Sequence, residues 1–238
     1  MPSEDLLFTS RFNIPAGTAE RFERWCDTRH FPDLLDAGFH SAVTFKSVQG
    51  EPEYLQLFEI PDLDVFDSPA FGEMCICDPP CPRPGCLAKE DPGRPGAQAM
   101  AAYFLDSSRA VYESFVTIGA GSPSATPCIF TARMDLEPSM ETEYLRWQER
   151  DVFPELAKVP GFVAGLIGRR VDNFEPDELH EHVAAEPMYV IMWEVESPDV
   201  YREDNPRLAA ARAHPDGPRM RQAVRRNLIN LAVRIGAE

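Results

Sequence analysis

Polar and apolar residues alternate along several short segments of the first half of the chain. This period of two predicts strands at Leu6–Ile14, Phe39–Val48, Tyr54–Ile60 and Val111–Ile118. Between the first two, Thr18–Ala37 has apolar residues about every four positions and predicts a helix that ends at Gly38. A second helical stretch with a long insertion follows Ile60. The order β-α-β-β-α-β is that of the ferredoxin-like motif.

The same order of strands and helices occurs twice in the chain. FTSRFNI at Phe8–Ile14 matches FTARMDL at Phe130–Leu136, EYLQLFEI at Glu53–Ile60 matches MYVIMWEV at Met188–Val195, and VTIGA matches VRIGA near the end of each copy. In the second copy we expect the second helix near Pro206–His214, continuing irregularly toward Arg226. Repeats in conserved order indicate duplication of one structural unit.

These matches divide the chain into a first repeat at 1–120, a linker at 121–127 and a second repeat at 128–238. The first repeat carries a Cys- and Pro-rich insertion at about 74–98 that the second lacks. Helices cover only one face of such a sheet, so its other face needs a partner. The fold class expected is α+β: two tandem ferredoxin-like repeats packed sheet to sheet as a pseudo-dimeric α+β barrel.

Composition excludes some classes of function. The 238 residues are 44% hydrophobic and 26% charged, as in globular proteins, and the net charge of −16 disfavours nucleic acid and anionic membranes as partners. No apolar run reaches membrane-spanning length and no signal peptide is evident. We therefore expect a cytoplasmic protein, either a monomeric pseudo-dimer or a homodimer, with a small-molecule substrate.

One motif points to a family. The first repeat reads W-x4-H-F-P-x-L-L from Trp25 through His30 to Leu35, then Gly38-Phe39, then P-x-Y-L-x-L-F-E from Pro52 to Glu59. This pattern resembles the EthD-like proteins and the wider dimeric α+β-barrel superfamily. The resemblance implies that fold, and it implies an activity among lyases, cyclases, isomerases, cofactor-free oxygenases and heme enzymes. Members often place a His of the first helix in a pocket between helix and sheet, which here is His30.

His30 is the candidate catalytic residue. It continues the apolar stripe of the first helix, whereas the second repeat has Val152 at this position. The fold therefore does not require His here, and an imidazole can exchange a proton near neutral pH. The alternative is a structural His bonded to the backbone. Phe22, Cys26 and Tyr54 are the expected substrate-pocket neighbours, although Tyr54 recurs as Tyr189 and is equally suited to a core.

Two further groups are ambiguous. Arg11 and Glu59 lie on strands that neighbour each other in this fold, and both recur as Arg133 and Glu194. A cross-strand ion pair in each repeat is the simplest interpretation, and binding of a substrate anion by Arg11 is the alternative. His180 and His182 form an H-x-H motif in the acidic segment Asn173–Glu186, which favours a solvated loop over a metal site.

The Cys-rich insertion carries a third candidate site. Cys75, Cys77, Cys81 and Cys86 supply four thiols in a short segment, enough for structural zinc, although the spacing is not that of paired C-x2-C motifs. Free thiols in a stiff loop, or a redox role, are the alternatives. The insertion follows the third strand of the first repeat and is placed to cap that repeat's pocket.

The leading functional hypothesis is a cofactor-free enzyme that uses His30 as general acid or base on an apolar, aromatic or polyketide-like substrate, as a lyase, cyclase or isomerase. One alternative is a cofactor-free or heme-dependent oxygenase, although no proximal His motif for heme is evident in the second repeat. Another is a non-enzymatic protein that binds a small molecule, or a partner through a zinc-stabilised loop.

Overall fold

The computed structural model of the chain describes residues 6–74, 104–122, 125–172, 174, 186–202 and 204–236. Eight antiparallel strands close into one barrel in the order β1-β3-β2-β8-β5-β7-β6-β4. The first repeat supplies β1 (Leu6–Asn13), β2 (Ser41–Gln49), β3 (Tyr54–Ile60) and β4 (Leu105–Gly119). The second supplies β5 (Cys128–Leu136), β6 (Phe162–Arg170), β7 (Tyr189–Val195) and β8 (Val224–Ile235). The predicted pseudo-dimeric α+β barrel is confirmed.

The two repeats share the barrel through hydrogen-bonded seams. The last strand of each repeat pairs with the second strand of the other: β8 lies against β2, and β4 lies against β6. Each sheet is therefore completed by a strand from the other half of the chain. β4 ends at Gly119 and β5 begins at Cys128, on either side of the predicted linker.

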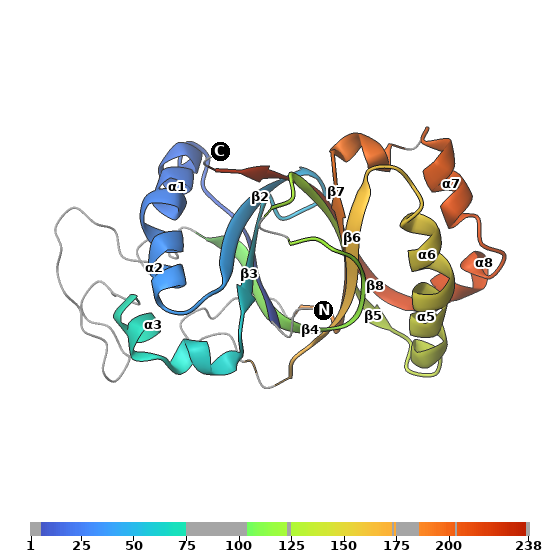
Figure 1. Cartoon of the computed structure of the whole chain (residues 1–238), viewed down its shortest axis with the longest axis horizontal. Coiled ribbons are helices and arrows are strands. Elements are labelled where there is room, and N and C mark those ends of the chain that lie inside the picture. The colour runs from blue at the N-terminus through green and yellow to red at the C-terminus, as the bar shows by residue number, and fades with distance from the viewer. Residues whose placement is uncertain are drawn as a thin grey trace.

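The helices lie outside the barrel on two opposite sides, one side for each repeat (Figure 1). The first repeat has α1 (Ala19–Trp25), α2 (Phe31–Asp36) and α3 (Pro69–Met74). The second has α5 (Glu141–Trp147), α6 (Phe153–Leu156), α7 (Pro206–Arg212) and α8 (Gly217–Met220). No helix among the described residues is long and apolar enough to cross a membrane.

The first helix of each repeat is interrupted by a π-helical turn. In the first repeat this turn is Cys26–His30, and the Phe31 N–H donates to the carbonyl of Cys26, five residues back. Pro32 follows, which has no N–H to donate and whose ring would clash with the carbonyl four residues before it. A wider turn removes that clash. Pro154 accompanies the same turn, Gln148–Val152, in the second repeat.

Some element boundaries differ from the expectation. The helical stretch of the second repeat does not reach Arg226, because β8 begins at Val224 and pairs with Leu136 of β5. The hydrogen bonds that the barrel offers to Val224–Arg226 outweigh the local helical tendency of this Arg-rich segment. In the first repeat, β2 begins at Ser41, two residues later than predicted.

Apolar side chains form separate cores inside and outside the barrel. The interior core includes Leu7, Phe45, Leu57, Ile129 and Met192. Outside, the second repeat packs its helices on the sheet through one continuous cluster. The first repeat does so through two separate clusters, one around Phe58 and Leu34 and one around Phe12, Phe22 and Trp25.

Candidate functional site

Polar residues run in a row across the outer face of the first sheet, under the helix that carries His30. Strand pairing places Arg109 of β4 opposite Ser10 of β1, Ser10 opposite Gln56 of β3, and Gln56 opposite Thr44 of β2. Gln56 Nε2 lies 3.3 Å from Cys26 Sγ on the helix and 3.4 Å from Thr44 Oγ1. We call Arg109, Ser10, Gln56 and Thr44 the polar row.

The second repeat has an apolar row in the same register. Ile229 of β8 is opposite Ala132 of β5, Ala132 is opposite Ile191 of β7, and Ile191 is opposite Ile167 of β6. All four polar positions of the first repeat are therefore replaced by aliphatic residues. The polar row explains why the outer core of the first repeat is split, while that of the second is continuous.

His30 lies between the two outer clusters of the first repeat. Its ring stacks on Trp25 with centroids 4.4 Å apart, and meets Phe58 edge-on at 6.3 Å. The residue as a whole is half-buried, but Nδ1 is buried and has no hydrogen-bond partner among the described residues. The indole Nε1 of Trp25 is also buried without a partner. Among the described residues Nδ1 has neither a backbone carbonyl nor a side chain as hydrogen-bond partner, so these contacts do not support the alternative of a His bonded to the backbone through this atom.

Burial and the nearby positive charge of Arg109 lower the pKa of His30 to about 3. The ring is therefore neutral at physiological pH and can accept a proton. The two unpartnered ring nitrogens, one on His30 and one on Trp25, are groups that a bound ligand could satisfy, because buried polar atoms are normally hydrogen-bonded.

The three expected pocket neighbours lie together. Phe22, Cys26 and Tyr54 belong to one buried cluster that also contains Trp25, through which they reach His30. Burial raises the pKa of the Cys26 thiol, so it stays protonated. The Tyr54 hydroxyl donates to Glu23 Oε1 at 3.1 Å and burial raises its pKa to about 12. The three residues therefore pack beside Trp25 and help to position His30.

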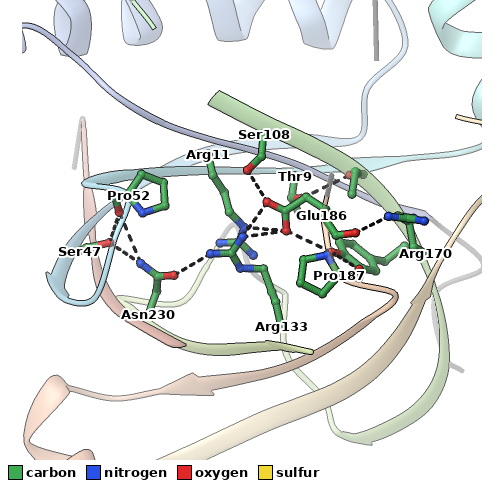
Figure 2. Close-up of polar contacts among 12 residues, drawn as sticks. Thr9, Arg11, Ser47, Pro52, Ser108, Arg133, Arg170, Glu186, Pro187 and Asn230 are labelled. Atoms are coloured by element: carbon green, nitrogen blue, oxygen red, sulfur yellow. Dashed lines mark hydrogen bonds and ion pairs between the residues drawn. The ribbon is translucent and has the colours of Figure 1, made fainter. Parts of the chain in front are cut away.

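The predicted Arg–Glu ion pairs are wrong. Arg11 is opposite Leu55 and Glu59 is opposite Leu7, while in the second repeat Arg133 is opposite Val190 and Glu194 is opposite Ile129. Each Arg is thus separated from its expected partner along the strand. Instead both guanidinium groups enter the barrel interior and approach Glu186 (Figure 2), which precedes β7.

Glu186 is held by several groups. Arg133 Nη1 donates to both of its carboxylate oxygens at 2.6 and 2.7 Å, and the Ser108 hydroxyl donates to Oε1. Burial alone would raise the pKa of Glu186, but Arg11 and Arg133 outweigh this and lower it. Sequence reasoning missed this residue. Its signal is Glu-Pro-x-Tyr, which precedes the third strand in both repeats, at Glu51 and at Glu186.

Glu59 and Glu194 lie toward the other end of the barrel interior. Glu59 accepts hydrogen bonds from Ser41 at 2.5 Å and from Ser122 at 3.2 Å. Burial and the nearby charge of Glu59 raise the pKa of Glu194 to about 7. The two recurring carboxylates therefore interact electrostatically across the repeats.

The remaining sequence candidates lie outside the described residues. These are the zinc candidates Cys75, Cys77, Cys81 and Cys86, and the His180–His182 motif. Both stay predictions.

No known family profile matches this sequence, and no curated protein matches it either. Solved structures do resemble it. A provisionally assigned monooxygenase from Fusobacterium nucleatum subsp. nucleatum aligns with a TM-score of 0.58 at 9% identity, over 98% of this chain and 94% of the other. An anthrone oxidase-like protein aligns with a TM-score of 0.55 at 12% identity, over 98% and 92%.

A provisionally assigned chlorite dismutase aligns with a TM-score of 0.54 at 10% identity, over 97% of this chain and 95% of the other. At such identities the likeness concerns architecture alone. It extends over nearly the whole of each chain, so both repeats and their mutual arrangement are included. The chain has the fold of the dimeric α+β barrels, with both halves of the barrel on one polypeptide.

Proposed function

We propose that this protein is a cofactor-independent enzyme that removes a proton from a small, largely apolar substrate at His30. The observation that carries the proposal is the polar row with His30 above it, which the first repeat has and the second replaces with aliphatic residues. A sheet face that packs well with aliphatic residues in one repeat does not need polar ones in the other. The polar residues are therefore explained by chemistry better than by packing.

The surroundings of His30 favour an aromatic or polyketide-like substrate. Trp25, Phe31 and Phe58 surround the imidazole with ring faces and edges. A planar substrate can stack in such surroundings and present a C–H beside a carbonyl, or a phenolic O–H. His30 is neutral and acts first as general base, taking that proton on a ring nitrogen; the negative charge that forms on the substrate favours the imidazolium and so strengthens this otherwise weak base.

Arg109 complements this step electrostatically. Its positive charge already disfavours protonation of His30 in the free protein. When the proton leaves the substrate, the negative charge that forms on the enolate or phenolate oxygen is attracted to Arg109. The imidazolium formed beside this charge is a strong acid and returns its proton readily to another substrate atom. Such a transfer completes an isomerisation, a cyclisation or an elimination.

Oxygen chemistry is the second candidate, favoured by the solved structures described as monooxygenase or anthrone oxidase-like. An enolate or phenolate made at His30 could react with dioxygen instead of taking the proton back. Oxygen uptake under air, compared with turnover without air, separates the two reactions. A Soret band in the absorption spectrum of the purified protein would identify the heme-dependent form of this alternative.

The test is a panel of hydroxyaromatic and 1,3-dicarbonyl compounds, with binding followed by quenching of Trp fluorescence and turnover followed by absorbance. For a compound that is turned over, His30→Val should lower kcat by about 10²–10⁴-fold, the usual contribution of a general base. Binding should change little, because Val occupies this position in the second repeat.

His40→Ala is the matched control, since His40 lies at the surface in the same repeat. It should leave turnover unchanged. Full turnover by a folded His30→Val protein would refute the catalytic role. Tight binding across the panel without turnover by the wild type would instead support a small-molecule-binding protein.

A further inference from the structure

The barrel interior contains more buried positive than negative charge around Glu186. Arg11 and Arg133 are 0% and 2% exposed, and Glu186 is 4% exposed. Arg133 takes both oxygens of this carboxylate, so Arg11 approaches only to 3.9 Å from Oε2, beyond hydrogen-bond distance. Figure 2 shows the two guanidinium groups on the same side of Glu186.

Arg11 lacks any hydrogen-bond acceptor in the part of the chain that the structure describes. Its Nε, Nη1 and Nη2 are all buried and unpartnered. Two further interior polar atoms share this condition, Arg133 Nε and Thr131 Oγ1. Thr131 lies two residues from Arg133 on β5 and is opposite Asn230. Because a buried guanidinium without acceptors is very unfavourable, these atoms favour binding of a group that accepts hydrogen bonds and carries negative charge.

The other interior carboxylates of the described residues, Glu59 and Glu194, lie toward the opposite end of the barrel, since Glu194 is opposite Ile129, four residues before Arg133 on β5. Glu59 is opposite Leu7, four residues before Arg11 on β1, which is roughly 13 Å along an extended strand. Glu51 is the counterpart of Glu186 in the Glu-Pro-x-Tyr motif, but it is exposed at the surface. The first repeat therefore leaves unfilled the place that Glu186 fills for the second.

We propose that the barrel interior binds one small monovalent inorganic anion, of the size of a halide ion, at the guanidinium of Arg11. The donors would be the unpartnered nitrogens of Arg11, with Arg133 Nε and the Thr131 hydroxyl as further candidates. One negative charge balances the second Arg, and the near-complete burial of Arg11, Arg133 and Tyr112 favours a small ion over a large organic anion. The site is separate from the His30 site, which lies on the outer face of the sheet.

Bromide is the probe for this site, because it scatters X-rays anomalously. Crystals of the wild-type chain grown in sodium bromide should give an anomalous peak within hydrogen-bond distance of Arg11. In solution, a hundredfold excess of bromide over its dissociation constant should raise Tm by roughly 5–10 °C relative to sodium gluconate at equal ionic strength, because gluconate is too large to enter.

Arg11→Met should abolish the difference between bromide and gluconate, whereas Arg24→Met, at an exposed Arg of the same repeat, should preserve it. The proposal would be overturned if only water contacted Arg11 in the bromide crystals and if the Tm of the protein depended on ionic strength alone. The crystallographic measurement uses the wild-type protein and decides the question even if Arg11→Met fails to fold.

Discussion

The two repeats share one strand order and one helix with the same π-helical turn, yet their outer sheet faces differ at every position of one row. In the first repeat the row is Arg109, Ser10, Gln56 and Thr44, and in the second it is Ile229, Ala132, Ile191 and Ile167. The second repeat shows what the fold needs at these positions, and the first shows what has been added. Comparison of the two repeats thus separates the residues that the fold requires from those that the proposed chemistry requires.

The same comparison applies inside the barrel. Glu51 and Glu186 stand at equivalent positions, but only Glu186 is buried beside the two guanidinium groups. The asymmetry therefore extends from the outer face of the sheets to the centre of the molecule.

Replacing Glu186 tests the interior asymmetry, and the effect should be large. Glu186→Gln leaves two buried guanidinium groups without a carboxylate and should cost about 3–5 kcal/mol in the free energy of unfolding. Glu51→Gln should change it by less than about 0.5 kcal/mol, because Glu51 is exposed. Urea denaturation of both variants measures the difference. Equal effects would mean that Glu186 is not needed to offset the buried charge.

Exchanging a residue between the rows tests the outer asymmetry. Ile191→Gln places an amide in a continuous apolar cluster and should destabilise the protein by about 2–4 kcal/mol. Gln56→Ile, the reverse change, should alter the free energy of unfolding by less than about 1 kcal/mol. Within the described part of the chain, the buried amide of Gln56 has only two hydrogen-bond contacts, to Cys26 and Thr44, so little is lost when an aliphatic side chain replaces it.

The same Gln56→Ile protein should lose turnover on any substrate identified for the His30 site. Loss of activity with stability retained is the expected mark of a polar residue kept for chemistry. If Gln56→Ile kept full activity but unfolded readily, Gln56 would be a structural residue and the proposed meaning of the polar row would fail.

The raised pKa of Glu194 should give a pH dependence of intermediate size. The folded-state pKa of Glu194, about 7, lies above its ordinary value of 4.5, so the folded protein binds the proton more tightly. Stability from this group is present below about pH 4.5 and is lost as the pH rises through 7. Glu194→Gln should remove that loss and raise stability at pH 8 by roughly 1–2 kcal/mol, as measured by denaturation at several pH values. An unchanged pH dependence would contradict the raised pKa of Glu194.

His30 should contribute a smaller dependence of opposite sign. Its folded-state pKa, about 3, lies below the ordinary 6.5, so the unfolded chain binds the proton more tightly. Stability from the neutral ring is present above pH 6.5 and is lost as the pH falls toward 3. Because the residue is half-buried, His30→Val should recover about 1 kcal/mol between pH 6.5 and 5. His40→Ala should not, and a similar recovery in both would assign the effect to surface charge.

The architecture could be predicted from the sequence because each repeat supplies an independent copy of the same periodic pattern. The match of EYLQLFEI with MYVIMWEV alone locates both third strands, and Tyr54–Ile60 and Tyr189–Val195 are observed there. Strand register could not be predicted in this way, because it depends on how the whole barrel closes. The expected Arg11–Glu59 pair failed for this reason.

His30 could be singled out from the sequence because the second repeat has Val152 at the same position. The residues around His30 could be predicted only in part. Phe22 and Cys26 share its helix, so helical spacing places them. Arg109 lies far along the chain on β4, and only the register of β1 with β4 brings it beneath the helix. The turn at Cys26–His30 also moves His30 from the buried stripe to a half-buried place, and that depends on the following Pro32.

The covalent link between the repeats changes how substitutions act. In a barrel made of two identical chains, every mutation appears in both halves. A single carboxylate shared by two symmetry-related arginines therefore cannot arise by one residue change, because the second copy of the carboxylate appears with it. In this chain Glu186 occupies that place alone, and Glu51 remains free to vary at the surface. Because β2 pairs with β8 and β4 with β6, neither half can be lost without opening the barrel. Selection can therefore act on one half while the other half preserves the scaffold.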